Sequence, residues 1–389
     1  MASAAETIGV VGGGQLALML CEAAASRQID VIVQTASEQD PAAKVACGQV
    51  NGAPTDAAAT RELSGRCRQI TFENEWVPVD ALLALEREGV VFSPSLTSLV
   101  PLVNKLSQRK LLNDLAIPSP AWICLDEINR AKPTLPAGWT FPVMAKAAHG
   151  GYDGKGTQVI PDLNALSQLL STVSAQDWLL ETWVSFEREL AMVVSRDCHG
   201  RIRCFPLVET HQRSQVCDWV LAPAPAEQLL EATAYNIAAS LLTSLNYVGV
   251  MALEFFYGPE GLMVNEIAPR THNSGHFSIE ACSSSQFDQQ LCITAGLPVP
   301  ATDLVAPGAL MVNLLGLPSE GSQPLERRLS ALRALPDSHV HWYGKEELPG
   351  RKLGHVTVLL QEADAPARTL EAHAVLEQIR SLWPNPLLN

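Results

Sequence analysis

The chain has 389 residues and a formal net charge of −14, with 47% hydrophobic and 17% charged residues. At about 100–200 residues per domain, the length predicts two or three domains, and this much apolar side chain can fill a large core, which argues against disorder. The acidic balance argues against non-specific binding to nucleic acid, because such binding depends on a surplus of Lys and Arg.

The cysteines and the apolar runs narrow the class of protein further. Nine cysteines are scattered along the chain and none forms a Cys-x-x-Cys pair, so the sequence gives no sign of a zinc or redox site. Free thiols are typical of a reduced compartment, and we expect a cytoplasmic protein. Residues 1–7 lack the pattern of a signal peptide, and no apolar run reaches the ~18 residues of a membrane span, so we expect no membrane association.

The chain opens with the pattern of a β-α-β unit. A strand at 8–11 leads through a glycine turn to an apolar helix at 16–25 and a strand at 31–33, which implies a parallel sheet covered by helices. Gly12-Gly13-Gly14-Gln15-Leu16-Ala17 fits the G-x-G-x-x-A phosphate-binding fingerprint. The second strand ends without the carboxylate that would hold the ribose of NAD. The turn therefore predicts phosphate binding other than NAD, with a plain strand–helix turn as the alternative.

The next elements lead to a lysine and a glycine-rich loop. We expect strands at 69–73 and 90–92, a connection at 94–101 and a helix at 105–115. Lys146 ends the apolar run 141–146, and a buried lysine is costly without a partner, so it should meet an anion unless its side chain reaches solvent. Residues 149–157 contain four glycines and predict a mobile loop that can lie against phosphates, although its pattern is not that of a P-loop.

Two glutamates beside a predicted hairpin carry the strongest signal. After strands at 177–181 and 190–194 and a helix at 227–245, strands at 248–256 and 262–266 should pair and bring Glu254 and Glu266, near their ends, side by side. Neighbouring carboxylates repel unless a cation lies between them, and Mg²⁺ commonly binds one or two carboxylates together with nucleotide phosphates. Asn265 adds an amide oxygen. Two exposed charges are the alternative, but the polar run 268–276 that follows suits a site for an anionic reactant.

Cations gather late in this acidic chain. His341-Trp342-Tyr343-Gly344-Lys345 is followed by Arg351 and Lys352 around further glycines. Such a cluster suits a phosphate pocket, and an ordinary basic turn is the alternative.

With these motifs together, the chain resembles the ATP-grasp superfamily and, within it, the N5-carboxyaminoimidazole ribonucleotide synthetase family. The resemblance rests on residues 12–16, 150–156, 265–276, 341–345 and 349–352, and it extends from residue 9 to about 355. It implies an α/β and α+β fold of three domains. These are a Rossmann-like, doubly wound domain at 1–104, an ATP-grasp domain with a glycine-rich lid at 105–305, and a small C-terminal domain at 306–389.

The resemblance also implies an activity, that of an ATP-dependent carbon–nitrogen ligase of purine biosynthesis. Such a ligase carboxylates 5-aminoimidazole ribonucleotide with bicarbonate, through carboxyphosphate, to N5-carboxyaminoimidazole ribonucleotide. The family further implies ATP and Mg²⁺, with Mn²⁺ as a possible substitute, a homodimer, and a functional link to the mutase of the next step.

Position by position, the family's roles fall on particular residues of this chain. ATP would be bound by Lys105, Lys146, Gly151, Tyr152, Asp153, Gly154, Lys155, Gly156, Thr157, Glu181, Thr182, Trp183, Val184, Glu189, Gln212, Asn265 and Glu266. The ribonucleotide would be bound by Gln15, Leu16, Glu73, Asn74, Tyr152, Asp153, Lys345, Arg351 and Lys352. Arg270, His272 and Asn273 would surround bicarbonate or carboxyphosphate, Asp153 would steer the amine proton, and Glu254 and Glu266 would bind the metal.

The chain departs from the family pattern in two places. The family usually continues its first turn with Gly-Arg-Met, where this chain has Ala17-Leu18-Met19. A family histidine near the nucleotide falls on Gln212, with His211 one residue earlier, so either Gln212 makes the contact or the segment is shifted.

Three other functions remain as alternatives. A formate-using glycinamide ribonucleotide transformylase would share the ATP machinery, but the substrate end, Tyr152 and Asp153 with Lys345 and Arg351, favours the carboxylating enzyme. An NAD-dependent dehydrogenase would leave the glutamate pair unexplained. A non-catalytic nucleotide-binding subunit would be expected to lack a metal carboxylate or the lid, and the sequence has both.

Overall fold

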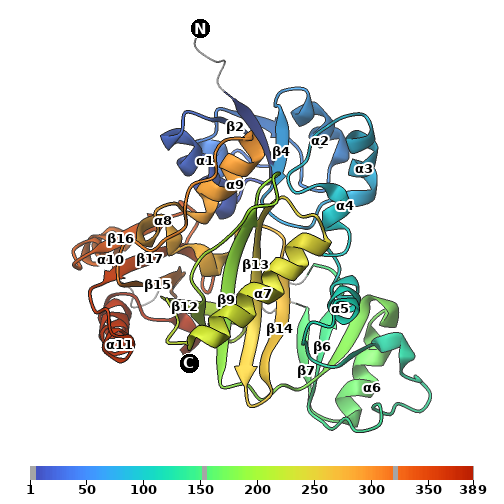
Figure 1. Cartoon of the computed structure of the whole chain (residues 1–389). Coiled ribbons are helices and arrows are strands. Elements are labelled where there is room, and N and C mark those ends of the chain that lie inside the picture. The colour runs from blue at the N-terminus through green and yellow to red at the C-terminus, as the bar shows by residue number, and fades with distance from the viewer. Residues whose placement is uncertain (1–5, 151–155, 319–322, 389) are drawn as a thin grey trace.

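The structure, a computed structural model, describes residues 6–150, 156–318 and 323–388. These residues form three β-sheets with helices packed against them (Figure 1). The strands are β1 (Thr7–Val11), β2 (Asp30–Thr35), β3 (Gly48–Asn51), β4 (Gln69–Phe72), β5 (Trp122–Cys124), β6 (Val143–Ala147), β7 (Thr157–Ile160), β8 (Trp178–Thr182), β9 (Arg188–Arg196), β10 (Ile202–Cys204), β11 (Val208–Arg213), β12 (Val216–Ala222), β13 (Gly249–Gly258), β14 (Gly261–Ala268), β15 (Gly308–Leu315), β16 (Ser338–Trp342) and β17 (Lys352–Leu360). The α-helices are α1 (Gln15–Ser26), α2 (Ala57–Ser64), α3 (Val79–Arg87), α4 (Leu96–Leu99), α5 (Lys105–Asp114), α6 (Leu163–Thr172), α7 (Gln228–Ser244), α8 (Ser278–Ala281), α9 (Gln286–Ala295), α10 (Leu325–Arg333) and α11 (Ala365–Leu382).

The N-terminal sheet is parallel, in the order β3-β2-β1-β4, as the opening β-α-β pattern predicts. Alternate residues of its strands face opposite ways. Val10 and Val33 pack with α1 and α9, whereas Ile32 and Ile70 pack with α2 and α3. A parallel sheet covered on both faces needs such continuous apolar strands.

One prediction for this region is wrong. The segment 90–92 is no strand, because Phe92 makes only a single parallel bridge to Ile70. The predicted connection at 94–101 contains the short helix α4, whose first turn is capped by the side chain of Ser95.

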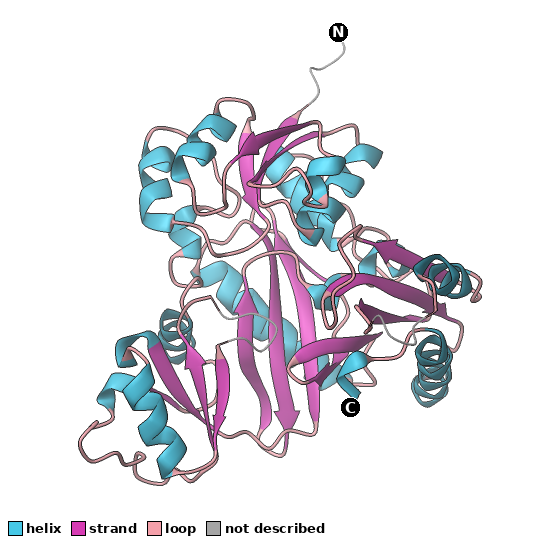
Figure 2. Ribbon diagram, turned by 180° about the vertical axis from the view of Figure 1, so that it is seen from behind, coloured by secondary structure: helices cyan, strands magenta, loops and turns pink. Residues whose placement is uncertain are grey.

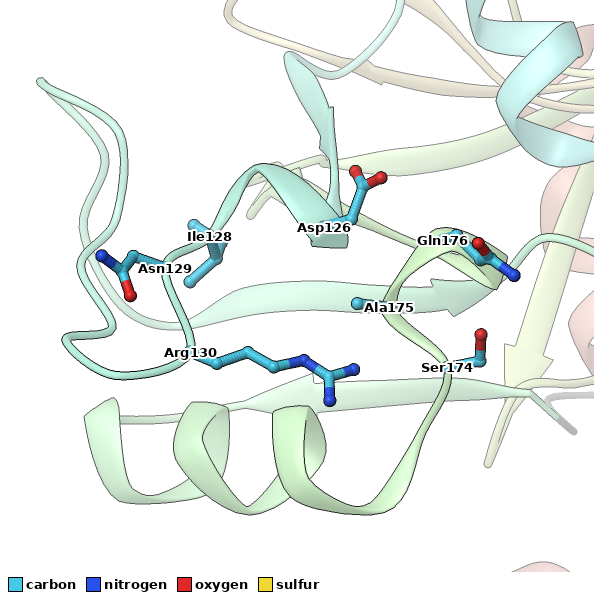
Figure 3. Close-up of a pocket in the computed structure, with 7 residues that line it drawn as sticks. All are labelled: Asp126, Ile128, Asn129, Arg130, Ser174, Ala175 and Gln176. Carbon is cyan, nitrogen blue, oxygen red and sulfur yellow. The ribbon is translucent and has the colours of Figure 1, made fainter.

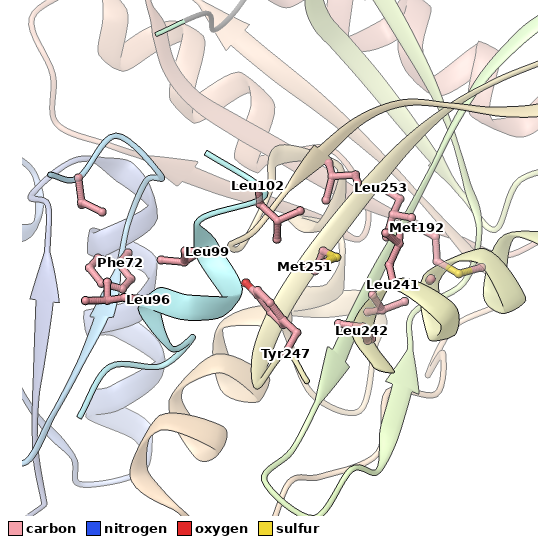
Figure 4. Packing of buried hydrophobic residues seen from close by; sticks show 14 of the residues in the cluster. Phe72, Leu96, Leu99, Leu102, Met192, Leu241, Leu242, Tyr247, Met251 and Leu253 are labelled. Carbon is pink, nitrogen blue, oxygen red and sulfur yellow. The ribbon is translucent and has the colours of Figure 1, made fainter. Parts of the chain in front are cut away.

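A long antiparallel sheet forms the centre of the molecule, in the order β14-β13-β9-β11-β12-β15-β17-β16, with β10 also paired to β9. The helix α7 covers one face of β9, β13 and β14 (Figures 1 and 2). Figure 4 shows Met192, Met251 and Leu253 of this face against Leu241 and Leu242 of α7. The same cluster runs through Tyr247, Leu99 and Leu102 to Phe72, so one apolar core joins the central sheet to the N-terminal sheet.

A second antiparallel sheet, in the order β5-β8-β6-β7, lies beside the central one and is covered by α6. Its apolar residues Val143, Ala145 and Leu180 pack against Leu166 and Leu169 of that helix. This unit carries the predicted strands at 141–146 and 177–181, and Lys146 and Glu181 lie on its two inner strands, β6 and β8.

Residues after 306 extend the central sheet rather than forming a separate one. The strands β15, β17 and β16 follow β12, and α10 and α11 pack on one face of them around Trp383. The division of the chain at residues 104 and 305 stays a prediction. Among the described residues, no helix combines the length and the apolar character needed to cross a membrane.

Candidate active site

Two glutamates of neighbouring strands face each other on the side of the central sheet that α7 leaves uncovered. Glu254 in β13 and Glu266 in β14 are register partners. Leu253 and Phe255, on either side of Glu254, are buried beneath α7, and side chains alternate along a strand, so the carboxyl groups point to the opposite face. The prediction that the glutamates lie near strand ends holds for Glu266, two residues before the end of β14, but it is wrong for Glu254, because β13 continues pairing to Gly258.

A β-bulge beside this pair gives Asn265 its position. Glu254 pairs with Glu266, but the next residue, Phe255, pairs with Val264, so Asn265 has no partner on β13. Bulges redirect a side chain and are frequent next to active sites. Here the Asn265 side-chain oxygen accepts a hydrogen bond of 2.9 Å from Lys146 Nζ.

Lys146 is buried and meets an anion, as predicted, and the anion is Glu181 of β8 at 2.8 Å. Burial lowers the pKa of Lys146, and Glu181 opposes that shift. Arg109 of α5 donates to the same carboxylate at 2.6 Å. Burial would raise the pKa of Glu181, but Arg109 and Lys146 lower it to about 2, so this carboxylate is ionised between two cations.

Arg109 is a residue that the sequence reasoning missed. Its guanidinium also donates to the backbone oxygens of Asn265, at 2.7 Å, and Val264, at 3.3 Å. It thereby ties α5 to β14 immediately before Glu266. The available signal was its spacing of four residues from Lys105, which puts both side chains on one face of a helix.

The charges of the glutamate pair are unequal. Lys105 Nζ lies 2.5 Å from Glu266 Oε1. Burial would raise the pKa of Glu266, but Lys105 holds it below its usual value. Burial, and then the negative charge of Glu266, raise the pKa of Glu254 to about 7. One carboxylate is therefore ionised while its neighbour keeps a proton up to near neutral pH.

The unequal pKa values of Glu254 and Glu266 indicate that the pair fits a divalent cation. A cation between the oxygens would remove the repulsion that raises the pKa of Glu254. Within the described ranges, no group of three or more His, Cys, Asp or Glu side chains is arranged to hold a metal. Two carboxylates suit Mg²⁺, which takes its remaining ligands from phosphates and water.

The polar run after β14 lies beside the glutamates. His272 Nε2 is 3.4 Å from Glu254 Oε1, and its Nδ1 is 2.9 Å from Ser274 Oγ. Gln286 holds the His272 backbone by accepting from its N–H at 2.8 Å and donating to its oxygen at 2.6 Å. Asn273 Nδ2 is buried and finds no hydrogen-bond partner within the described part of the chain. A buried donor left unpaired costs about 1–3 kcal/mol, so it is suited to an incoming acceptor.

The predicted phosphate site at the first glycine turn is already occupied by a protein carboxylate. Glu73, directly after β4, accepts from the N–H groups of Gly14 at 2.7 Å and Leu16 at 3.2 Å. A Cβ added at Gly12 or Gly14 would lie 2.4 Å from the Glu73 carboxylate. The turn therefore binds an anion, as expected of a helix N-terminus, but the anion belongs to the chain itself.

The positively charged residues near the C-terminus, Lys345, Arg351 and Lys352, lie in this same region. Lys345 donates a hydrogen bond to Gln15 beside the glycine turn. Burial lowers the pKa of Lys345, Glu73 opposes that shift, and Arg351 and Lys352 add to it, so the three cations lie close enough to interact. Asn74 accepts from the backbone N–H of Trp76 at 3.0 Å and shapes the turn after Glu73.

The predicted nucleotide residues lie along the uncovered face and the junction of the two antiparallel sheets. Thr182 ends β8 and is followed by Trp183, which is exposed, and by Val184. Glu189 of β9 pairs with Phe256 and Thr210. Burial raises the pKa of Glu189 to about 7, an effect reduced by a hydrogen bond from the backbone N–H of Gln212.

Strand geometry places Gln212 and His211 on opposite faces of β11. Thr210 pairs with Glu189, so alternation along β11 puts Gln212 on the same face as Glu189 and His211 on the other. His211 stacks on Trp219, with ring centres 5.1 Å apart. The register shift at this point arises because Asp218 on β12 has no partner on β11. The alternation of side chains along β11 is therefore undisturbed.

Part of the predicted lid lies outside the described residues, namely Gly151, Tyr152, Asp153, Gly154 and Lys155. At its end, Gly156 accepts from the N–H of Ala147 at 2.7 Å, and Thr157 pairs with Lys146.

An open depression of about 500 Å³ lies elsewhere, on the β5–β8 unit beyond the site (Figure 3). It is lined by Asp126, Ile128, Asn129, Arg130, Ser174, Ala175 and Gln176. None of the residues predicted to act on ATP, bicarbonate or the ribonucleotide is among them.

The chain matches three family models along its length. They are an ATP-grasp domain over residues 110–287, a ribonucleotide synthetase preATP-grasp domain over residues 5–100, and a phosphoribosylaminoimidazole carboxylase C-terminal domain over residues 309–369. The mixed arrangement of helices and strands agrees, and the predicted ATP-grasp fold is confirmed.

Relatives and solved structures agree with these matches. The N5-carboxyaminoimidazole ribonucleotide synthase of Synechococcus elongatus is 46% identical over 385 residues, which are 99% of this chain and 97% of the relative. A carboxyaminoimidazole ribonucleotide synthase structure from Aspergillus clavatus complexed with ATP has a TM-score of 0.87 at 29% identity, covering 97% of this chain and 99% of that one. A second structure from Aspergillus clavatus, in complex with ADP and 5-aminoimidazole ribonucleotide, has a TM-score of 0.85 at 29% identity with the same coverage. This chain belongs to the N5-carboxyaminoimidazole ribonucleotide synthase family of ATP-grasp enzymes.

Proposed function

We propose that this chain is an ATP-dependent ligase of purine biosynthesis that carboxylates 5-aminoimidazole ribonucleotide with bicarbonate to N5-carboxyaminoimidazole ribonucleotide. The observation that carries the proposal is the register pairing of Glu254 with Glu266, flanked by Lys105 and the buried Lys146. Two carboxylates with two lysines beside them suit the binding of a metal-bound triphosphate.

Glu254 and Glu266 would hold Mg²⁺, for which Mn²⁺ could substitute, and Asn265 lies beside them. When bound, the cation would supply positive charge that neutralises the transferring phosphoryl group. Lys105 and Lys146 would add charge on the phosphates, and Glu181 keeps Lys146 in place for that role.

Bicarbonate would lie beside Arg270, His272 and Asn273. Bicarbonate is a poor electrophile, and phosphorylation by ATP would convert it to carboxyphosphate, which releases CO₂ to the amine of the ribonucleotide. The buried, unpaired Asn273 Nδ2 offers a donor for one of its oxygens. Carboxyphosphate is labile in water, so a closing lid over 150–156 would protect it.

The ribonucleotide would lie where the N-terminal turn meets the late cations. Lys345, Arg351 and Lys352 would bind its phosphate, while Gln15, Leu16, Glu73 and Asn74 line the adjacent turn. Tyr152 and Asp153 would approach from the lid, and Asp153 would steer the proton of the amine. On the nucleotide side, Glu189 would bind the ribose of ATP, and residues 181–184 its adenine.

Assays that omit one component at a time test the proposal. ADP release and product formation should both require ATP, bicarbonate and the ribonucleotide, and formate should not replace bicarbonate. Full turnover with formate and glycinamide ribonucleotide would favour the transformylase instead. Equal ADP release without the ribonucleotide would contradict the proposal.

The proposal also includes the location of the protein in the cell, its oligomeric state and its division into domains. All nine cysteines are free, which suits the cytoplasm. We further propose a homodimer and a functional link to the mutase that uses the product, and the three-domain division at 104 and 305. Sedimentation of the purified chain would test the dimer.

A further inference from the structure

A short turn after β4 reaches two separate parts of the proposed site. Glu73 is bound to the glycine turn at the ribonucleotide end. Glu75, two residues later, is bound to Arg270, in the polar run that follows β14. Asn74 stands between them and caps the turn. One short segment therefore contacts the residues proposed for the ribonucleotide and those proposed for bicarbonate.

The contact between Glu75 and Arg270 fixes the direction of the guanidinium. Arg270 Nε lies 2.6 Å from Glu75 Oε2, and Nη2 lies 3.5 Å from Glu75 Oε1. The remaining branch, Nη1, donates to the backbone oxygen of Thr271 at 3.1 Å. The side chains are only 17% and 12% exposed, so solvent screens this two-point contact weakly.

Arg270 has other acidic neighbours that would compete for it. Burial would lower its pKa, but Glu75 first, and then Glu266 and Glu73, raise it. Glu266 belongs to the pair proposed to hold the metal, and Glu73 to the ribonucleotide end. Without Glu75, a buried positive charge would lose its closest partner and be drawn towards these carboxylates, because an uncompensated buried charge is costly.

We propose that Glu75 is a positioning residue, which holds Arg270 at the carboxyphosphate position and so keeps ATP cleavage coupled to carboxylation of the ribonucleotide. This inference rests on the proposed function. When Arg270 is held, carboxyphosphate stays beside the amine until CO₂ is transferred. When Arg270 is displaced, water cleaves carboxyphosphate back to bicarbonate and phosphate, so ADP and phosphate are released without carboxylated product.

The test is the ratio of ADP released to product formed in Glu75→Gln, which keeps a hydrogen-bond acceptor but loses the charge. In the wild type the ratio should be about one, as the reaction's balance requires. In the variant we expect the ratio to rise several-fold and the KM for bicarbonate to rise about tenfold or more, with the KM for ATP nearly unchanged. Glu75→Asp, with a shorter arm, should give intermediate values and serves if Glu75→Gln does not fold.

Arg27→Gln is the matched control. Arg27 follows α1 directly and forms an ion pair of 2.7 Å with Asp288 of α9, so it also joins the N-terminal unit to the rest of the chain, and neither member of the pair is a proposed site residue. Its loss should lower thermal stability while leaving the ratio and the bicarbonate KM as in the wild type.

The outcomes separate this inference from the proposed function. Wild-type ADP release that does not need the ribonucleotide would refute the proposed function before any variant is made. A coupled wild type together with Glu75→Gln and Glu75→Asp that both keep the wild-type ratio and bicarbonate KM would overturn the role of Glu75. So would Arg27→Gln uncoupling as strongly as Glu75→Gln, since that would indicate a purely structural effect.

Discussion

Glu254 and Glu266 are register partners across β13 and β14, yet the pKa values of their carboxyl groups are shifted in opposite directions. Lys105 keeps Glu266 ionised, and burial together with Glu266 raises the pKa of Glu254 to about 7. A divalent cation held by the pair, as proposed, would take the place of the proton on Glu254.

The raised pKa of Glu254 predicts that Mg²⁺ binding weakens as the pH falls below about 7. Protonated Glu254 cannot serve as a ligand, so the apparent Kd for Mg²⁺ should rise about tenfold per pH unit on the acid side of its pKa and level off above it. Activity titrations with Mg²⁺ at pH 6 and pH 8 measure this. Glu254→Gln should bind Mg²⁺ more weakly at both pH values and with a flatter pH profile. An equally steep profile in the variant would show that another group is responsible.

The buried carboxylate of Glu181 predicts a large cost for removing Arg109. Arg109→Gln leaves Glu181 with one cation instead of two and should lower the free energy of unfolding by about 3–5 kcal/mol, measured by urea denaturation. The exposed pair of Arg61 with Glu88 supplies the control, because Arg61→Gln removes a charge that solvent already screens. Similar losses of unfolding free energy in the two variants would contradict a large contribution from the buried triad of Arg109, Lys146 and Glu181.

The alternation along β11 predicts different results for two adjacent variants. Gln212→Ala should raise the KM for ATP, because Gln212 shares a face with Glu189. His211→Ala should leave that KM nearly unchanged and instead lower stability by about 0.5–1.5 kcal/mol through loss of its stacking on Trp219. Steady-state kinetics and thermal unfolding distinguish them, and the reverse pattern would show that His211 faces the nucleotide.

The close approach of Glu73 to the glycine turn predicts that Gly14→Ala impairs ribonucleotide binding. A Cβ there would lie 2.4 Å from Glu73 Oε1, so the carboxylate must move and lose its hydrogen bond from the turn. We expect the KM for the ribonucleotide to rise about tenfold, as one lost charge-assisted hydrogen bond implies, with that for ATP unchanged. Gly65→Ala at the end of α2 is the matched control, because a Cβ added there would meet only the backbone oxygen of Glu62, at an ordinary contact distance of 3.4 Å. Equal effects on both substrates would contradict the assignment.

Sequence reasoning recovered the parts of the fold that local pattern determines. The opening β-α-β unit, the buried lysine and the neighbouring glutamates follow from apolar periodicity and the cost of burying charge, and the structure contains all three. The strand predicted at 90–92 failed because a short apolar run does not reveal whether a partner edge extends beyond one bridge.

The residues that were missed act through long-range contacts. Arg109 meets Glu181, and Glu75 meets Arg270 across 195 positions, so neither pairing leaves a local signature. The bulge at Asn265 is equally hidden, since it depends on how β13 and β14 align. The glycine turn was predicted to bind a phosphate, and sequence alone could not show that the carboxyl group of Glu73 accepts its N–H groups instead.

The most direct measurement is anomalous diffraction from crystals grown with Mn²⁺ and a non-hydrolysable ATP analogue. A metal peak bridging the carboxylates of Glu254 and Glu266 and the terminal phosphates is the predicted result. A bound analogue with its metal coordinated elsewhere, and both glutamates held only by protein side chains, would contradict the account.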